Sequence, residues 1–155
     1  MPVWQQSMKR IIDIIVSLFF LLLLSPVYII TALVIKLSSR GPVFFAQERI
    51  GLHGNPFTIY KFRSMFVGAE KGTPMLSSDN DSRITPIGKF MRGIRLDEIP
   101  QFYNVLKGDM SIVGPRPERQ FFIDKIMEQA PHYRHLHKVR PGITSRHSGT
   151  TPASH

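Results

Sequence analysis

The chain of 155 residues contains no cysteine. This absence excludes disulfide bonds and zinc sites built on thiolates. Acidic residues are scarce as well, because 11 Asp and Glu stand against 20 Lys and Arg and leave a formal net charge of +9. In a soluble protein this charge would suggest nucleic acid, whereas beside a membrane segment it suggests anionic lipid head groups or phosphorylated substrates. The length allows one domain at most, with one modest core.

Charged residues are also missing from positions 14–35, where Leu, Ile, Val and Phe dominate. A run of this length matches the roughly 20 apolar residues that a bilayer core requires. It is too long for a signal peptide, and no small-residue cleavage pattern separates it from Lys36 and Leu37. We therefore predict that residues 1–40 remain attached as a membrane anchor.

Ser25 and Pro26 lie at the middle of this apolar run. Proline removes one helical hydrogen bond, and a neighbouring serine hydroxyl or interfacial water could satisfy the freed carbonyl. Two half-helices of about eleven residues would each reach roughly 16 Å, about half the hydrocarbon thickness. Basic residues mark both flanks as cytoplasmic: Lys9, Arg10, Lys36 and Arg40. These observations alone leave two interpretations open, a re-entrant hairpin and a proline-kinked spanning helix.

Residues 43–50 and 57–65 are rich in aromatic and β-branched side chains and flank a turn at 53–56. This pattern predicts a β-hairpin. Side chains alternate along a strand, so Ile59, Lys61 and Arg63 share one face. Two cations in register suggest a wall that binds phosphate, although a solvated edge would explain a lone lysine equally well.

Thr85 followed by Pro86 is typical of a helix start. The apolar stripe of this helix consists of Ile87, Phe90, Met91 and Ile94. Arg92 and Arg95 are three positions apart and therefore lie near one another on the helix surface. We predict a second helix from near Asp97 to Gly108, which would place carboxylates at a helix N-terminus.

Asp97 and Glu98 form an adjacent acidic pair directly after these arginines. Cations can screen substrate phosphate, while one carboxylate holds a metal and the other attacks or abstracts a proton. Acidic pairs are also common at ordinary solvated helix starts. Residues 112–117 form a stiff turn in which prolines flank Arg116, and residues 119–127 resume a helical pattern. The pattern favours an anionic substrate that arrives with a divalent cation.

Several polar residues receive no chemistry at this stage. Asp13 could pair with Arg10 or with a basic group of the later chain. Asp79 and Asp81 lie in a polar loop that lacks the glycine and terminal glutamate of an EF-hand. Three histidines lie close together, at His132, His135 and His137. Their basic neighbours oppose a bound cation, and their role stays open.

Longer motifs run through the whole chain at residues 41–45, 47–51, 61–65, 95–101, 104–111, 113–118 and 139–144. In these motifs the sequence resembles the bacterial sugar transferases that load a phosphosugar onto polyprenol phosphate, the monotopic phosphoglycosyl transferases. The resemblance covers residues 9–144. A motif set this long and ordered is far more specific than a single short pattern.

The resemblance implies an α+β, mostly helical fold, with a re-entrant anchor broken at Ser25 and Pro26, a β-hairpin and interfacial helices. It divides the chain into an anchor (1–40), a catalytic domain (41–144) and an atypical tail (145–155), which we expect to be disordered. It also implies a site on the cytoplasmic face of the bacterial inner membrane. The product would initiate exopolysaccharide, capsule, O-antigen or glycoprotein glycan synthesis, and later glycosyltransferases of that pathway are possible partners.

In the chemistry that the resemblance implies, Asp97 attacks the β-phosphate of a UDP-sugar and releases UMP. Glu98 helps to bind Mg²⁺ on the diphosphate. The phosphosugar then passes from Asp97 to polyprenol phosphate. The residues expected to contact phosphate and nucleotide are Lys61, Arg63, Arg92, Arg95, Pro115, Arg116 and Pro117.

Two rival interpretations remain. A membrane-tethered basic module could bind nucleic acid through aromatic residues that stack on bases. The candidates are Phe62, Phe66, Phe102 and Tyr103. These residues are more simply explained as part of the hydrophobic core, and we expect no bound nucleic acid. Alternatively, the chain is an inactive remnant. After Thr144 it departs from the family pattern, and we expect a shortened chain of poor activity.

Overall fold

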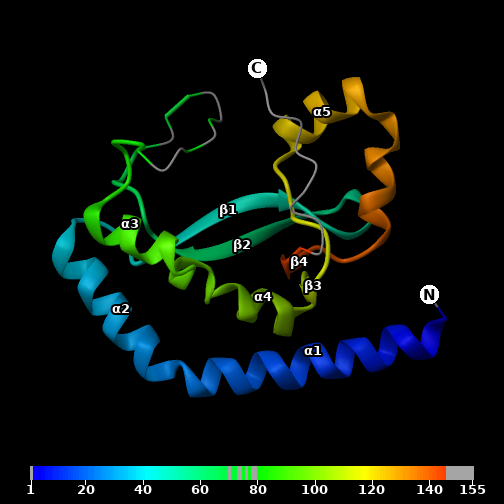
Figure 1. The fold of residues 1–155 in the computed structure, drawn as a ribbon, viewed down its shortest axis with the longest axis horizontal. Coiled ribbons are helices and arrows are strands. Elements are labelled where there is room, and N and C mark those ends of the chain that lie inside the picture. The colour runs from blue at the N-terminus through cyan, green and yellow to red at the C-terminus, as the bar shows by residue number, and fades with distance from the viewer. Residues whose placement is uncertain (1, 70, 73–74, 76, 78–79, 146–155) are drawn as a thin grey trace.

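The computed structural model describes residues 2–69, 71–72, 75, 77 and 80–145. The fold is α+β and mostly helical, as predicted (Figure 1). The α-helices are α1 (Val3–Leu23), α2 (Ser25–Ser38), α3 (Pro86–Gly93), α4 (Gln101–Lys107) and α5 (Gln120–Gln129). The strands are β1 (Phe44–Ile50), β2 (Pro56–Phe62), β3 (Ser111–Val113) and β4 (Gly142–Thr144). Three 3-10 helices complete the order: η1 (Leu52–Gly54), η2 (Leu96–Glu98) and η3 (Pro131–Lys138).

Helices α1 and α2 meet at a sharp bend of 60°. The predicted break is confirmed, since Ser25 and Pro26 are the first residues of α2. Proline fits the first helical turn because its missing N–H would have no partner there. The Ser25 hydroxyl donates to the Leu22 carbonyl at 2.8 Å and so satisfies one group at the end of α1.

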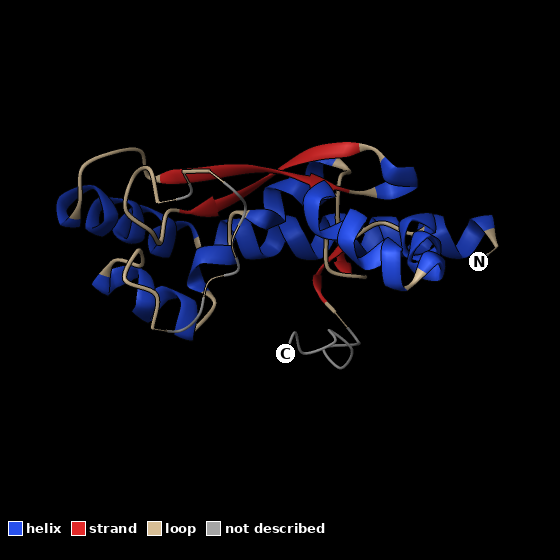
Figure 2. Cartoon of the chain, turned by 90° about the horizontal axis from the view of Figure 1, so that it is seen from above, coloured by secondary structure: helices blue, strands red, loops and turns tan. Residues whose placement is uncertain are grey.

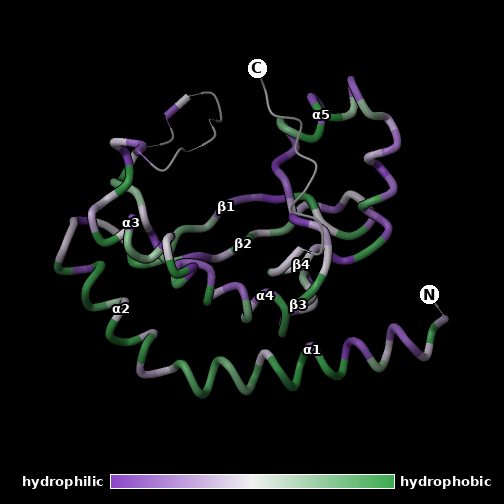
Figure 3. The backbone as a smooth tube through the Cα atoms, viewed as in Figure 1, coloured by the Kyte–Doolittle hydropathy of each residue, from purple (hydrophilic) through white to green (hydrophobic). Residues whose placement is uncertain are grey.

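No single helix of the described chain is long and apolar enough to cross a bilayer. Together, α1 and α2 meet the length and composition required, across their bend. Figure 3 shows apolar residues concentrated on these two helices. Their exposed apolar side chains include Ile11, Ile15, Leu18, Phe19, Leu22, Ile29, Ile30, Leu33 and Leu37. A contiguous apolar surface of this kind marks a contact with membrane or partner, and the re-entrant course stays a prediction.

The expected lengths of the two half-helices are wrong. Helix α1 has 21 residues and α2 has 14, whereas about eleven were expected for each. The basic flank before the apolar run is itself helical, because no proline or glycine interrupts the chain between Val3 and Leu23. Lys9 and Arg10 therefore lie inside α1.

Asp13 pairs with neither of the groups that its position suggested. Its carboxylate lies 3.6 Å from Lys9 Nζ, one turn earlier on α1, and accepts a hydrogen bond from Ser111. Arg10 instead donates to the carbonyls of Val105 and Leu106, at 2.5 Å and 3.0 Å, where α4 ends. Both contacts fix α1 against the rest of the chain.

The elements form three layers, in which α3 and α4 lie between the bent pair α1–α2 and the hairpin β1–β2 (Figure 1). Figure 2, a perpendicular view, shows that the two strands run along the long axis of the molecule. Phe20 of α1 stacks on Phe102 of α4, with ring centroids 5.4 Å apart. Tyr28 of α2 donates to the Ile99 carbonyl at 2.7 Å, just before α4.

The predicted hairpin is confirmed: β1 and β2 are antiparallel, with Phe44 opposite Phe62 and Ile50 opposite Pro56. Phe62 packs with Ile35 and Met91 in one buried cluster. Behind the hairpin lies a second cluster formed by Ile59, Val105 and Met110. The buried amide of Asn104 joins β2 to α4, since it donates to the Thr58 carbonyl at 2.7 Å and accepts from the Tyr60 amide at 3.1 Å.

Helix α3 begins as predicted, because Thr85 Oγ1 accepts a hydrogen bond of 3.0 Å from the Gly88 amide. The next prediction is partly wrong. Asp97 and Glu98 lie in the short turn η2, and α4 begins only at Gln101. The turn at η2 is closed by a short-range hydrogen bond from the Ile99 amide to the Leu96 carbonyl at 3.3 Å, as in a 3-10 helix, and the α-helical pattern starts only after Pro100. The carboxylates thus do not lie at the N-terminus of α4, which nevertheless ends at Gly108 (φ 104°) as expected.

The remaining sequence features have plain structural settings. Asp81 accepts hydrogen bonds from Arg83 Nε at 2.9 Å and 3.0 Å. Asp79 and the tail after Ser145 lie outside the described residues. The three histidines belong to η3. Within the described ranges, no three His, Asp or Glu side chains are grouped so that they could hold a metal ion.

Candidate active site

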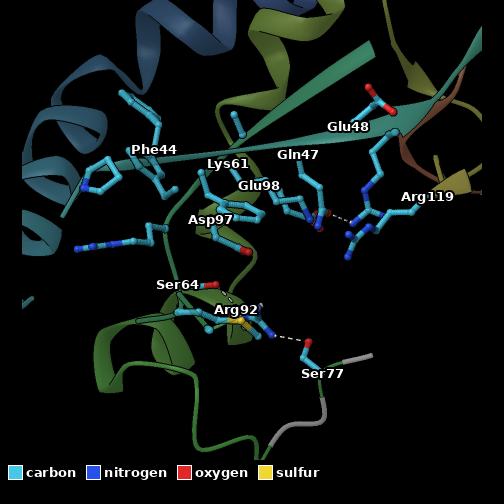
Figure 4. A pocket seen from close by; sticks show the side chains of 18 of the residues that line it. Phe44, Gln47, Glu48, Lys61, Ser64, Ser77, Arg92, Asp97, Glu98 and Arg119 are labelled. Carbon is cyan, nitrogen blue, oxygen red and sulfur yellow. Dashed lines mark hydrogen bonds and ion pairs between the residues drawn. The ribbon is translucent and has the colours of Figure 1, made fainter. Parts of the chain in front are cut away.

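A cavity of about 980 Å³ lies between the hairpin, α3, η2 and the start of α5 (Figure 4). Its lining includes Asp97 and Glu98 together with all five cations predicted from the sequence, which are Lys61, Arg63, Arg92, Arg95 and Arg116. Figure 4 shows Asp97 between Lys61 and Arg92, with Arg119 and Phe44 on opposite sides. The fold therefore brings the acidic pair and its predicted basic neighbours into one space.

The backbone at Arg95 turns the acidic pair toward this cavity. Arg95 adopts a left-handed conformation, with φ 59° and ψ 25°. This region costs an ordinary residue roughly 1–2 kcal/mol, and such strain concentrates at functional sites. The turn ends α3 and starts η2, so that Asp97 becomes buried, with 7% of its surface exposed.

Glu98 is held by two cations. One carboxylate oxygen lies 3.6 Å from Lys61 Nζ, and the other lies 3.3 Å from Arg95 Nε. Lys61 comes from the end of β2, whereas Arg95 comes from the residue before η2. Glu98 thus bridges the hairpin and the turn beside Asp97.

Burial raises the pKa of Asp97 above its ordinary value. The ammonium of Lys61 opposes this rise, Glu98 adds to it, and Arg92 opposes it more weakly. Burial also lowers the pKa of Lys61, while the negative charges of Glu98 and Asp97 act to raise it. Oppositely perturbed groups that share a cavity are typical of functional sites.

Arg92 links α3 to the loop that follows β2. Its Nε donates to Ser64 Oγ at 2.9 Å, and its NH1 group donates to Ser77 Oγ at 2.8 Å. Both partners are neutral hydroxyl groups. Neither of these contacts neutralises the positive charge of the guanidinium. That charge faces the same cavity as Asp97 and suits an anionic substrate.

A second basic group lies farther along the cavity, on the side of Asp97 where Figure 4 shows Arg119. Arg116 Nε is 3.9 Å from Glu118, and Arg49 NH1 is 3.7 Å from the other oxygen of the same carboxylate. Arg119 also lines this end. The prolines beside Arg116 fix its turn: the Pro115 carbonyl accepts from the Gly142 amide at 2.9 Å, and Pro117 is buried.

The site thus combines a buried carboxylate, a metal-capable neighbour and two groups of cations in one cavity. A sequence profile described as "Bacterial sugar transferase" matches residues 4–150. The chain belongs to the bacterial sugar transferase family. The family predicted from the motifs is therefore confirmed.

Named relatives of this family are similar over most of the chain. A UDP-N-acetylgalactosamine-undecaprenyl-phosphate N-acetylgalactosaminephosphotransferase of Aeromonas hydrophila is 48% identical over 88% of this chain and 32% of its own length. A UDP-glucose:undecaprenyl-phosphate glucose-1-phosphate transferase of Escherichia coli is 47% identical over 88% of this chain and 30% of its own. A putative undecaprenyl-phosphate N-acetylgalactosaminyl 1-phosphate transferase of Bacillus subtilis is 44% identical over 81% of this chain and 70% of its own. The chain thus spans about a third of the length of the first two.

Arg63 does not join Lys61 in a wall of cations. Its guanidinium donates to the Arg40 carbonyl at 2.5 Å and to the carbonyl and hydroxyl of Ser39, at 3.1 Å and 2.7 Å. The residue is 5% exposed and holds the segment that leaves α2. Its predicted role in substrate binding stays a prediction, whereas its structural role in this sugar transferase chain is evident.

Several residues of the cavity were not predicted as site residues. They include Gln47, Arg49, Ser64, Ser77 and Arg119. The first three lie in motifs that carry the family resemblance, so the motifs themselves contained the signal. Ser77 and Arg119 lie outside every motif and become part of the site only through the fold.

The donor set fits a magnesium ion that takes most of its ligands from a diphosphate and water. Mg²⁺ is commonly bound by one or two carboxylates and by substrate phosphates, not by a complete protein cage. Asp97 and Glu98 are adjacent on η2 and line one cavity, so Glu98 could serve as such a single carboxylate. Glu98 would then exchange part of its contact with Lys61 or Arg95 for the ion.

Proposed function

We propose that this sugar transferase moves a phosphosugar from a UDP-sugar to polyprenol phosphate, with Asp97 as the nucleophile. The observation that carries the proposal is the buried Asp97 carboxylate, set between Lys61 and Arg92 in a cavity large enough for a nucleotide sugar. The activities for which its relatives are named support the choice of substrates.

In the first step, a carboxylate oxygen of Asp97 attacks the phosphorus that bears the sugar. A new oxygen–phosphorus bond forms, and the bond from that phosphorus to the bridging oxygen of the diphosphate breaks. UMP leaves with the electron pair, and the sugar phosphate stays on Asp97 as an acyl phosphate. No proton has to be removed from the nucleophile, because the reactive form of Asp97 is the ionised one.

In the second step, a phosphate oxygen of polyprenol phosphate attacks the same phosphorus. The bond to Asp97 breaks, and the carboxylate leaves with its electron pair. The product is a polyprenol diphosphate sugar, and Asp97 is regenerated. Both substrates and both products are anions, so the surrounding cations stabilise charge throughout.

The cations divide between the reacting phosphates and the nucleotide. Lys61, Arg92 and Arg95 lie beside the acidic pair and would screen the diphosphate. Arg116 lies in the second basic group and would hold the nucleotide phosphate, on a turn fixed by Pro115 and Pro117. Glu98 would hold Mg²⁺, which supplies charge neutralisation of the diphosphate when bound.

The bent pair α1–α2 would place this chemistry at a membrane surface. We propose that it enters and leaves the cytoplasmic leaflet of the bacterial inner membrane on the same side, with its exposed apolar residues in lipid. One substrate is soluble and the other has its phosphate at the bilayer surface, so a site held at the interface meets both. The product would initiate synthesis of a bacterial surface or protein-linked glycan, and later glycosyltransferases would extend it.

The decisive experiment measures UMP release by the purified chain from a panel of UDP-sugars, with and without polyprenol phosphate. UDP-glucose and UDP-N-acetylgalactosamine belong in the panel because relatives are named for these donors. We expect a single-turnover burst of UMP without acceptor and continued turnover with it. Turnover that strictly requires acceptor and shows no burst would contradict the covalent step. Salt-sensitive oligonucleotide binding without UMP release would favour the rival nucleic-acid module.

A further inference from the structure

The two ends of the active-site cavity differ in chemistry. One end is basic, as described above. The other end has an apolar rim, which we define as Pro42, Phe44, Phe66 and Val67. Phe44 and Phe66 are each 49% exposed, and Val67 is 65% exposed. Side chains of this type usually lie in a core, so their exposure around a cavity indicates a ligand or surface with apolar character.

The apolar rim is joined to the end of the membrane anchor. Pro42 follows α2 by only a few residues, and Lys36 of α2 donates to the Gly41 carbonyl at 3.3 Å. Gly41 has φ 123°, and a Cβ there would lie 2.5 Å from a Val67 methyl group. The segment that leaves α2 therefore packs directly under the rim, and Arg63 fixes it further through Ser39 and Arg40.

Asp97 lies between this rim and the basic end. Figure 4 shows Phe44 on one side of Asp97 and Arg119 on the other. A nucleotide sugar carries its negative charge on the diphosphate and polar groups on both sides of it, so the diphosphate suits the basic end and no hydrocarbon part of the donor requires the apolar rim. The acceptor has one phosphate on a long hydrocarbon chain that starts in the bilayer, which matches an apolar rim at the anchor.

We propose that the apolar rim binds the isoprene units of polyprenol phosphate nearest to its phosphate, and so guides that phosphate from the bilayer to Asp97. This inference rests on the proposed transfer to polyprenol phosphate and adds the route by which the acceptor enters. The donor and acceptor approach Asp97 from opposite ends of the cavity. UMP can therefore leave by the basic end while the acceptor arrives over the rim.

The test separates the two half-reactions. The variant Phe66→Ser/Val67→Ser removes apolar area from two exposed positions and disturbs no buried cluster. The first half-reaction is the burst of UMP, with sugar-labelled protein as its product. The second is discharge of that label by polyprenol phosphate in mixed micelles. We expect an unchanged burst and an acceptor concentration for half-maximal discharge that rises about tenfold, as the loss of two apolar contacts predicts.

Two matched controls accompany this variant. Val139→Ser makes the same change at a position that is 51% exposed and outside this cavity, and it should leave both half-reactions unchanged. Phe66→Leu/Val67→Ile keeps the rim apolar and should restore discharge. An altered circular dichroism spectrum of the serine variant would identify a folding defect. Comparison with the conservative variant then shows whether discharge is lost through misfolding or through loss of apolar contact with the acceptor.

Each outcome has one meaning. A raised requirement for acceptor with an intact burst supports the proposal. An unchanged discharge overturns it and leaves the proposed function standing. A weakened burst with normal discharge also overturns it, since the rim would then contact the nucleotide sugar. Absence of labelled protein from the unmodified chain would contradict the proposed function itself, and the route with it.

Discussion

The hydroxyl of Ser111 donates a hydrogen bond of 2.7 Å to the buried carboxylate of Asp13, across 98 residues of sequence. Lys9 completes the group, because its ammonium donates to both the Ser111 hydroxyl and the Val113 carbonyl. The contact joins α1 to β3, the strand that leads into the turn of Arg116. Helix α1 is thus attached to the later part of the chain by buried polar contacts, and not only through the chain that follows α2.

The first prediction concerns this attachment. Asp13→Ala leaves the Ser111 hydroxyl and the Ile112 amide without their acceptor and removes the ion pair with Lys9, and an unsatisfied buried group costs about 1–3 kcal/mol. We expect the free energy of unfolding in mild detergent to fall by this amount. Asp124→Ala is the matched control, because Asp124 is exposed on α5, and its effect should stay within about 0.5 kcal/mol. Equal effects of the two substitutions would show that the buried contact contributes nothing.

The second prediction separates backbone strain from side-chain contact at Arg95. Both Arg95→Ala and Arg95→Gly remove the ion pair with Glu98, but only glycine adopts φ 59° without strain. The glycine variant should be the more stable of the two by about 1 kcal/mol in thermal or denaturant unfolding. Both variants should lose transferase activity to a similar extent, since both lack the guanidinium. If alanine is as stable as glycine, the left-handed turn is not a source of strain.

The third prediction is that both ends of the bent pair lie on the same side of the membrane. The chain has no cysteine, so Gln5→Cys and Asn55→Cys each provide a single label at an exposed position. We expect both to be shielded from an impermeant thiol reagent in intact cells and labelled after lysis. Labelling of only one of them in intact cells would establish a spanning course. Pro26→Ala, which restores a hydrogen bond at the bend, should shift the segment toward that spanning course.

The fourth prediction concerns pH. Asp97 must be ionised to attack, and Lys61 holds its pKa down against the effect of burial. Lys61→Met removes that charge, so the pKa of Asp97 rises further and the acidic limb of kcat/KM for UMP release moves to higher pH. Lys61→Arg keeps the charge and should leave the limb in place. A limb that does not move in Lys61→Met would assign it to a group other than Asp97.

Much of this fold follows from local chemistry and was predictable. Pro26 fits only the first turn of a helix and so marks the break before α2, Thr85 caps the helix that Pro86 begins, and Gly108 adopts the positive φ that ends α4. The hairpin likewise follows from composition and its turn. These features depend on a few consecutive residues, and tertiary contacts did not override them.

The partners of buried polar groups were not predictable, because they are set by distant segments. Arg63 shares a motif with Lys61, yet it binds the chain after α2 instead of facing the acidic pair. Ser77 joins the site only because Arg92 reaches across from α3. Alternation along a strand predicts the face of the sheet on which a side chain lies. It does not predict which distant group a long arginine side chain will contact.

The last prediction tests Asp97 by activity and stability together. Asp97→Asn should abolish the sugar-labelled protein, because an amide cannot act as the nucleophile, whereas Glu98→Gln should weaken the dependence on Mg²⁺ as well as the rate. The same Asp97→Asn change should stabilise the fold at neutral pH. Burial raises the folded-state pKa of Asp97 above the unfolded value, so the ionised carboxylate destabilises the fold and stability falls as pH rises through that window.

Thermal unfolding of Asp97→Asn and the unmodified chain from pH 4 to pH 8 measures this effect. The variant should be the more stable at pH 8, in the range of about 0.5–2 kcal/mol that one stabilising substitution commonly contributes. The gap should narrow as pH falls toward 4, because Asp97 is then increasingly protonated in the folded chain. A labelled intermediate in Asp97→Asn would assign the nucleophile to another residue. A variant that is less stable at every pH would show instead that the carboxylate holds the fold together, in which case loss of label alone would not identify Asp97 as the attacking group.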